Sequence, residues 1–380
     1  MSWDKIAFSE LVEFPPKISL EKNELYDNIP MDVVDGGIKY IQEINKRVYT
    51  GGGAKFGNGD TIFARITPCL ENGKIAKVKG LEKEVGFGST EFFVFRAKEN
   101  ISDPDFIYYL AKTDLVRQPA IKSMVGASGR QRADKGVVEQ VEVPNIPLTT
   151  QRKIASILSA YDELIENNLK RIKLLEEKAF VSYKGIVKSE KLEQIKLKEV
   201  AAVNESSLKA NSNLEKLLYV EISSVSTGSI DNKTEYDFKE APGRAKRILK
   251  HEDIIWSCVR PNRKSYSFVW MPEDNLIAST GFAVISANEI PSTFLYQLTT
   301  SNEFVDYLEN HAKGATYPAV TAKDFEEAFI NIPSKSTMKE YHITTYPLFE
   351  LKHNLEKQNV KLREARDILL PRLMSGEIEV

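Results

Sequence analysis

Arginine, asparagine and glutamine gather in short loops at matching places in two halves of the sequence. Arg65-Ile66-Thr67-Pro68 follows a short apolar run, and Arg260-Pro261-Asn262-Arg263-Lys264 follows the matching run. Ser128-Gly129-Arg130-Gln131-Arg132 and Lys313-Gly314-Ala315-Thr316-Tyr317 form a second pair of loops. Arginine can bind guanine edges, asparagine and glutamine can bind adenine edges, and lysine holds phosphates. These residue types in loops indicate recognition of duplex DNA.

Two basic runs support this interpretation. One lies between Arg117 and Lys135 and is opposed only by Asp134, and the other lies between Arg244 and Lys264 and is opposed by Glu252 and Asp253. A single run of this kind is most often a solvated face, but its presence in both halves favours a binding surface. The candidate DNA-binding residues are Arg65, Asn72, Lys74, Ser128, Arg130, Gln131, Arg132, Arg244, Lys246, Arg247, Arg260, Asn262, Arg263, Lys264, Lys313, Thr316 and Tyr317.

The two halves are copies of one sequence pattern that recurs after about 190 residues. Gly59-Asp60-Thr61-Ile62-Phe63 recurs as Glu252-Asp253-Ile254-Ile255-Trp256, and Ser89-Thr90-Glu91-Phe92 recurs as Ser279-Thr280-Gly281-Phe282. A period this long exceeds that of solenoid repeats, so it predicts two globular domains of one fold in tandem. The length of 380 residues agrees, because a single core rarely grows so large.

Motifs for catalysis are missing from the chain. It contains no phosphate-binding loop, no HExxH, no GxSxG and no Asn/Asp-Pro-Pro-Tyr/Phe motif of base methyltransferases. Pro104-Asp105 with Glu176-Glu177-Lys178 resembles a restriction nuclease cluster, but its second part lies in a predicted coiled coil and chance matches are common. Cys69 and Cys258 lack zinc-ligand spacing. The chain is therefore expected to be non-catalytic and to bind no metal.

Net charge and hydrophobic composition indicate how the protein could bind DNA and where it is located. The net charge of −2 gives no global attraction to a polyanion, so DNA binding must depend on local patches. The sequence has no apolar window long enough to cross a membrane, and Met1-Ser2-Trp3-Asp4-Lys5 does not resemble a signal peptide. We expect a cytoplasmic protein that does not contact membranes.

A heptad pattern of apolar residues follows each globular half. In the first copy, a lone amide at Asn168 interrupts the pattern, whose other members are Ile154, Leu158, Tyr161, Ile165, Ile172, Leu175 and Ala179. In the second, Gln358 falls at the matching position among Leu348, Leu351, Leu355, Leu362, Ala365 and Leu369. Paired polar interruptions predict that the two helices form an antiparallel coiled coil. The alternative is that each stripe packs on its own domain.

Each helix of about 30 residues would be roughly 45 Å long and would separate the domains like a ruler. Thr149 or Thr150 is expected to cap the first helix. Pro347 has no match in the first copy, so it is expected to kink the second helix or to mark its start.

The globular halves are expected to be α+β. Short buried strands are predicted at residues 61–64, 92–95, 254–256 and 282–285, and helices are predicted at 106–115 and 293–307. The predicted domains are 1–148 and 185–334, with a spacer helix at 149–184 and a second spacer helix with its C-terminal tail at 335–380.

In its loops, its repeat and its long helices, the chain resembles the specificity subunits of type I restriction-modification systems. The resemblance extends over nearly the whole chain and includes Asn58-Gly59-Asp60-Thr61-Ile62-Phe63-Ala64-Arg65, Ala241-Pro242-Gly243-Arg244-Ala245-Lys246-Arg247, Val259-Arg260-Pro261-Asn262, Gln151-Arg152-Lys153-Ile154 and Pro371-Arg372-Leu373-Met374-Ser375-Gly376-Glu377-Ile378. Each motif is weak alone, but their order in a tandem repeat ending in heptad helices is specific.

The resemblance implies two target-recognition domains, each recognising one half of a bipartite, asymmetric site in double-stranded DNA. It also implies that methyltransferase subunits, expected to be two, dock on the helices, and that restriction subunits join them. No cofactor is then expected on this chain, since S-adenosylmethionine, ATP and Mg²⁺ would belong to the partners. The alternative function is a coiled-coil adaptor that presents two protein-binding modules.

Overall fold

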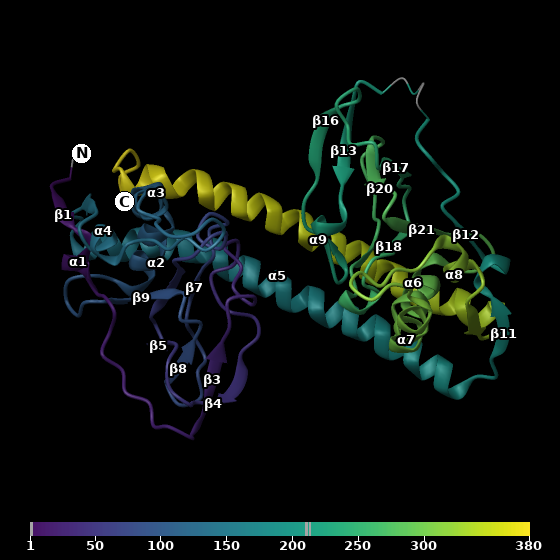
Figure 1. Ribbon diagram of the computed structural model, residues 1–380, viewed down its shortest axis with the longest axis horizontal. Helices are drawn as coiled ribbons and strands as arrows, with labels where there is room; N and C mark the ends of the chain where they lie inside the picture. The colour runs from purple at the N-terminus through teal and green to yellow at the C-terminus, as the bar shows by residue number, and fades with distance from the viewer. Residues whose placement is uncertain (1–2, 210–211, 213) are drawn as a thin grey trace. The chain divides into compact units, whose positions relative to one another are not determined.

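The repeat in the sequence is a repeat in the fold. The computed structural model describes residues 3–209, 212 and 214–380. The chain divides into two units, which we call unit 1 (Met1–Lys170 with Leu355–Val380) and unit 2 (Arg171–Asn354). Each unit mixes small sheets with helices (Figure 1), so the predicted α+β class is confirmed.

Unit 1 contains three small sheets. The antiparallel sheet has the strand order β2 (Val12–Glu13), β9 (Phe92–Ala97), β6 (Thr61–Ala64) and β7 (Ile75–Lys77). A mixed sheet has the order β4 (Asn45–Val48), β3 (Leu25–Ile29), β8 (Val85–Gly88) and β5 (Ala54–Gly57), with β3 and β8 parallel. A two-stranded sheet pairs β1 (Lys5–Ala7) with β10 (Glu142–Pro144). The predicted strands at 61–64 and 92–95 are confirmed.

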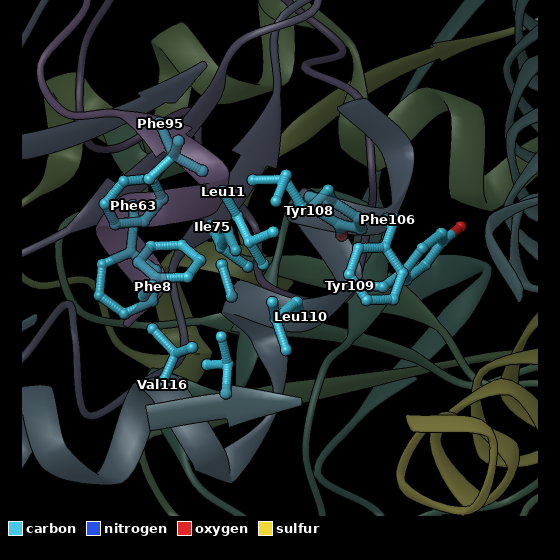
Figure 2. Close-up of a cluster of buried hydrophobic side chains, with 14 of the residues drawn as sticks. Phe8, Leu11, Phe63, Ile75, Phe95, Phe106, Tyr108, Tyr109, Leu110 and Val116 are labelled. Carbon is cyan, nitrogen blue, oxygen red and sulfur yellow. The ribbon is translucent and has the colours of Figure 1, made fainter. Parts of the chain in front are cut away.

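The core of unit 1 forms around one almost entirely buried helix. The helices are α1 (Phe8–Leu11), α2 (Pro104–Lys112), α3 (Asp114–Lys122), α4 (Lys135–Glu139), the first part of α5 (Leu148–Ser189) and the last part of α9 (Lys335–Met374). In α2 all six residues from Phe106 to Ala111 are buried. Figure 2 shows Phe106, Tyr108 and Leu110 in the same buried cluster as Phe8 and Phe95; the rings of Phe8 and Phe95 meet edge to face, with 5.0 Å between their centres. Phe63 of β6 and Val116 and Ala120 of α3 belong to this core, so it anchors the elements that precede the segments 65–67 and 125–133.

Unit 2 repeats this plan strand by strand. Its sheets are β12 (Ala201–Val203), β21 (Phe282–Ala287), β18 (Ile254–Ser257) and β19 (Tyr266–Phe268); β16 (Thr234–Asp237), β13 (Lys216–Val220), β20 (Leu276–Ser279) and β17 (Ala245–Ile248); and β11 (Glu193–Lys196) with β22 (Phe329–Ile332). A hairpin of β14 (Val225–Ser226) and β15 (Ser229–Ile230) is added. The predicted strands at 254–256 and 282–285 are confirmed.

The helices of unit 2 follow the order of those in unit 1. They are α6 (Ser292–Thr300), α7 (Asn302–His311), α8 (Ala322–Glu326) and the first part of α9 (Lys335–Met374), with 3-10 turns η1 (Leu197–Glu199), η2 (Ile222–Ser224) and η3 (Pro261–Arg263). Both units therefore share the order of their main strands and helices, and unit 2 adds the β14–β15 hairpin and further 3-10 turns.

The single helices predicted at 106–115 and 293–307 are wrong, because each is two helices. Thr113 separates α2 from α3, and Ser301 separates α6 from α7, both with extended backbone. The Thr113 hydroxyl donates to Leu110 O at 2.6 Å, and the Ser301 hydroxyl accepts from Phe304 N at 3.2 Å. A small hydroxyl residue that satisfies helix ends favours a break that apolar periodicity does not reveal.

The predicted N-cap of the first long helix is also wrong. α5 begins at Leu148, so Thr149 and Thr150 lie inside it. The carbonyl of Pro147 accepts from Thr150 N and Gln151 N at 2.9 Å each. The buried Gln151 amide donates to Ile146 O at 2.8 Å and accepts from Asp103 N at 2.9 Å. The start of the helix is thus fixed by proline and by a buried glutamine.

Pro347 does not mark the start of the second long helix. α9 begins at Lys335, where the Ser334 hydroxyl accepts from Thr337 N at 3.2 Å, and it continues through Pro347. Met338 and Tyr341 are buried in unit 2 ahead of the proline. This packing stabilises the first turns despite the backbone hydrogen bond that proline cannot make.

The predicted pairing of the long helices is confirmed within each unit. In unit 1, Asn168 Nδ2 donates to Asn359 Oδ1 at 2.9 Å, and Asp162 pairs with Arg366. In unit 2, the Tyr341 hydroxyl donates to Ala179 O at 3.0 Å. Residue numbers rise along α5 while those of their partners fall along α9, so the helices run antiparallel (Figure 1).

The seam between the helices differs from the predicted heptads on α9. On α5, Leu158, Ile165 and Asn168 are buried and Tyr161, Ile172 and Leu175 are half-buried. On α9, Leu355 is buried and Leu348, Leu362 and Leu369 are half-buried, but Leu351 is 38% exposed and Gln358 is exposed. Asn359, one residue later, takes the place expected for Gln358. A helix of 3.6 residues per turn drifts against a strict heptad, which explains the slip.

Candidate nucleic-acid interface

Arg65 begins a loop that is bonded to the two segments beside it. Its N–H donates to Glu91 O at 3.0 Å, and its carbonyl accepts from Ala133 N at 2.8 Å. Its Nε lies 3.4 Å from Glu91 Oε2, and the guanidinium lies 5.4 Å from the centre of the Phe93 ring. Arg65 is therefore held by both its backbone and its side chain.

A second loop, residues 125–133, folds back against the first. Thr67 N donates to Gln131 O at 2.9 Å, and Gln131 N donates to the Thr67 hydroxyl at 3.0 Å. Gly126 and Gly129 adopt positive φ values of 130° and 75°, which allow the tight turn. The tip of the loop carries Ser128 and Arg130, both exposed. We call residues 65–67 and 125–133 loop pair 1.

Glu91, which no sequence pattern singled out, joins Arg65 and Arg132, two of the three arginines of loop pair 1. Its carboxylate accepts from Arg132 Nε at 2.9 Å and from Arg132 Nη2 at 2.7 Å. The side chain of Glu91 is 19% exposed and that of Arg132 is 44% exposed. The hydrogen bonds from Arg132 lower the pKa of Glu91 below its ordinary value. Only the matched segments Ser89-Thr90-Glu91 and Ser279-Thr280-Gly281 could have drawn attention to this position.

Asn72 and Lys74 line a pocket of about 220 Å³ together with Asp35, Lys112 and Arg117. The Lys74 ammonium donates to Met31 O at 2.8 Å. The Lys74 carbonyl accepts from Ala64 N at 3.0 Å, so the backbone of Lys74 lies beside the start of loop pair 1.

Unit 2 has an equivalent loop pair, residues 258–264 and 313–320, which we call loop pair 2. Arg260 N donates to Pro318 O at 2.7 Å, as Thr67 N does to Gln131 O. Val320 N donates to Cys258 O at 2.9 Å, as Ala133 N does to Arg65 O. Arg260 therefore occupies the position of Thr67, whereas Cys258 occupies that of Arg65.

Arg260 is positioned by backbone conformation and by an aromatic ring. It adopts φ 52° and ψ 63°, an uncommon conformation for a side-chain-bearing residue. Its guanidinium lies 4.5 Å from the centre of the Tyr317 ring, and its Nη2 donates to Thr316 O at 3.2 Å. Tyr317 is 65% exposed. The structure thus brings together three of the candidate residues of unit 2.

The remaining candidates of unit 2 lie nearby or on the surface. Asn262, Arg263 and Lys313 are exposed, and Lys264 Nζ donates to Asn302 Oδ1 at 3.1 Å. Arg244 and Lys246 accept from Thr280 N at 2.8 Å and Leu208 N at 2.7 Å through their carbonyls. The turn at Thr280 and Gly281 thus connects Arg244 with loop pair 2, because Gly281 O accepts from Cys258 N at 2.8 Å.

Arg247 is the candidate that is least available for DNA. Its Nε is buried and has no hydrogen-bond partner among the residues that the structure describes. Its charge acts on Cys258, although burial dominates and raises the pKa of that thiol to about 11. Arg247 is half-buried, and its Nε is withdrawn from solvent.

The nuclease-like residues each pair with lysines of their own unit. Asp105 belongs to unit 1, where its carboxylate pairs with Lys39 at 2.9 Å and Lys77 at 2.5 Å, whereas Glu176 belongs to unit 2 and pairs with Lys352 at 2.5 Å. Within the described ranges, no three His, Cys, Asp or Glu side chains are grouped to hold a metal ion. The same ranges contain no helix that is both long and apolar enough to cross a membrane.

The chain is similar to known specificity subunits of restriction enzymes. It is 27% identical over 302 residues to the type I restriction enzyme MjaIX specificity subunit of Methanocaldococcus jannaschii, which covers 73% of this chain and 69% of that protein. It is 29% identical over 180 residues to the EcoAI specificity subunit of Escherichia coli, covering 44% of this chain and 30% of that subunit.

A solved structure has the same fold. The S subunit of a type I restriction-modification system from M. genitalium superposes with a TM-score of 0.53 at 18% identity, covering 98% of this chain and 96% of that one. The model of the type I restriction modification DNA specificity domain matches residues 2–177 and again residues 189–359. With two such matches, one for each copy of the repeat, the chain belongs to the family of type I restriction-modification DNA specificity subunits.

Proposed function

We propose that this chain selects the DNA target of a type I restriction-modification complex by recognising a bipartite, asymmetric site in double-stranded DNA. Loop pair 1 would bind one half of the site and loop pair 2 the other. One observation carries the proposal: the same backbone hydrogen bonds hold two loop pairs whose side chains differ. A constant frame with unlike contact residues suits two half-sites of unlike sequence.

The proposal assigns a role to each part of the chain. Residues 1–148 and 185–334 would be the recognition domains, residues 149–184 the first spacer helix, and residues 335–380 the second spacer helix with its tail. The methyltransferase subunits, two by expectation, would dock on the helices, and the restriction subunits would join through them. Catalysis, with S-adenosylmethionine, ATP and Mg²⁺, would then belong to those partners.

Binding of DNA as a function of salt tests the proposal. The chain is assembled with its modification subunit, and its affinity for random and for site-containing duplexes is measured between 50 and 200 mM salt. A protein that contacts six to ten phosphates loses roughly 10³–10⁵ in affinity over such a range. An adaptor for proteins would show no measurable DNA binding even with the modification subunit present, and that result would refute the proposal.

Loop variants test whether each unit recognises its own half-site. Sequencing of methylated sites in a host that carries this chain and its partner identifies the target. Arg130→Ala should then relax recognition in one half only, and Arg260→Ala in the other, since the two residues lie in different units. Equal losses in both halves for each variant would contradict independent recognition.

The length of the paired helices tests the proposed ruler. Four residues, about one helical turn, are inserted into α5 and into α9 so that the antiparallel pairing is kept. We expect the number of unread base pairs between the half-sites to change. An unchanged gap in the methylated sites would exclude the helices as the spacer.

A further inference from the structure

Glu91 engages one edge of the Arg132 guanidinium and leaves another available. The carboxylate accepts from Nε and Nη2, while among the described residues Nη1 makes only a long hydrogen bond of 3.5 Å to Arg130 O. A guanidinium carries five donors in a rigid plane. The edge formed by Nη1 and the second Nη2 hydrogen therefore remains for a ligand with two adjacent acceptors.

Guanine presents such a pair of acceptors in the major groove. Its O6 and N7 accept two hydrogen bonds from one arginine, and this is the most common specific contact between proteins and DNA. An unrestrained arginine must lose much side-chain freedom to make it. A carboxylate that fixes the opposite edge removes part of that loss before the DNA arrives.

Unit 2 shows that the fold does not require this arrangement. Where unit 1 has Arg65, Glu91 and Arg132, loop pair 2 has Cys258, Gly281 and Ala319, held by the equivalent backbone hydrogen bonds. The frame thus forms without the carboxylate and without either arginine. Because the frame needs neither the partly buried carboxylate nor the two arginines, we interpret these three side chains as having a role in binding.

We propose that Glu91 is a positioning residue that holds Arg132 so that its free edge binds a guanine in the half-site recognised by unit 1. Arg65, whose Nε lies 3.4 Å from Glu91 Oε2, steadies the carboxylate from its other side. The proposal rests on the function proposed above, because it assigns a base contact within that site.

The test compares Glu91→Gln with the wild-type chain, both assembled with the modification subunit. Affinities are measured for a set of duplexes in which each base pair of the methylated site is changed in turn. We expect Glu91→Gln to reduce discrimination about tenfold at one guanine of a single half-site. Arg132→Lys, which keeps the charge but loses the planar fork, should relax the same base pair. The double variant should lose no more than Arg132→Lys alone.

The matched control is Glu142→Gln, which removes an exposed carboxylate of unit 1 that pairs with Lys5 at 3.2 Å. It should leave discrimination unchanged at every position. Thermal midpoints are recorded for all variants, so that unfolding is distinguished from lost recognition. If Glu91→Gln does not fold, Arg132→Lys still shows whether discrimination at one guanine depends on the planar guanidinium of Arg132.

Three outcomes would overturn the inference while leaving the proposed function intact. Glu91→Gln could weaken binding to all duplexes alike, strengthen binding to random DNA because a negative charge is lost, or leave discrimination as in the wild type. By contrast, a wild-type complex with no preference among the duplexes would overturn the proposed function itself.

Discussion

Unit 1 and unit 2 hold their loop pairs with the same backbone hydrogen bonds but place unlike side chains on them. Loop pair 1 carries two arginines joined by Glu91, whereas loop pair 2 carries one arginine that stacks on Tyr317. The strands and the backbone hydrogen bonds that both units share therefore set the frame. The side chains that could contact DNA differ without changing these hydrogen bonds.

The contacts of the long helices differ between the units in the same way. In unit 1 the buried Asp162 pairs with Arg366 and accepts from the Tyr109 hydroxyl at 2.5 Å. In unit 2, α9 packs through rings, with Tyr346 4.9 Å from Trp270 and Phe349 5.1 Å from Phe268 between ring centres. The same fold thus accommodates either a buried ion pair or packed aromatic rings in the contacts of its long helices.

The largest effect is expected from breaking the ionic contact of unit 1. Arg366 is 0% exposed and Asp162 is 3% exposed, so Arg366→Ala would leave a buried carboxylate without its countercharge. We expect the free energy of unfolding of unit 1 to fall by about 3–5 kcal/mol. Chemical denaturation monitored in each unit measures this loss.

Arg372→Ala is the control on the same helix, because Arg372 forms an exposed pair with Glu377 at 2.7 Å. It should cost less than about 1 kcal/mol. A loss of this small size for Arg366→Ala as well would mean that the ionic contact does not hold α9 on unit 1.

Asn168 and Asn359 form a polar contact in the seam between the long helices of unit 1. They pair with each other and are 7% and 2% exposed. Asn168→Leu should cost about 1–3 kcal/mol, because the Asn359 amide would be buried without a partner. Unfolding in denaturant measures the loss.

The double variant Asn168→Leu with Asn359→Leu completes this experiment. It should recover most of the stability, since both polar groups are gone, while the register of the helices becomes less well defined. A double variant as unstable as the sum of the two single ones would show that the amides act separately.

The sequence predicted the features that repeat or alternate over many residues. Short apolar runs such as Ile254-Ile255-Trp256 became central strands, and the offset between copies predicted two units of one fold. The antiparallel helix pair also followed from the heptads. These features depend on summed burial, which a pattern of residue types records directly.

Features decided by one hydrogen bond were missed or misplaced. The helix break at Thr113 depends on a hydroxyl, and the seam at Asn359 depends on a drift of one residue along α9. The role of Glu91 depends on two arginines, one 26 and one 41 residues away in sequence. A local sequence pattern does not extend over separations of this length, so these groups come together only when the chain folds.

The pH dependence of loop pair 1 is expected to differ from that of loop pair 2. Hydrogen bonds from Arg132 lower the pKa of Glu91 in the folded state, so the ionised carboxylate stabilises the fold above the ordinary glutamate pKa. This contribution, about 1 kcal/mol, is lost as the pH falls through the lowered pKa. Thermal midpoints of the wild type and Glu91→Gln should therefore differ at pH 7 and converge once the pH has fallen below the lowered pKa of Glu91. A difference that persists at low pH would show that the charge is not its source.

The smallest effect is expected from the ring that positions Arg260 in loop pair 2. Tyr317 is 65% exposed, and a cation–π contact at an exposed site contributes about 0.5–1 kcal/mol. Tyr317→Leu should therefore leave the thermal midpoint nearly unchanged but reduce discrimination a few-fold in the half-site of unit 2, because the guanidinium is less well fixed. Tyr317→Phe keeps the ring and should retain discrimination. If both variants behave alike, the ring does not position Arg260, and the hydrogen bond to Thr316 O with the left-handed backbone is sufficient to do so.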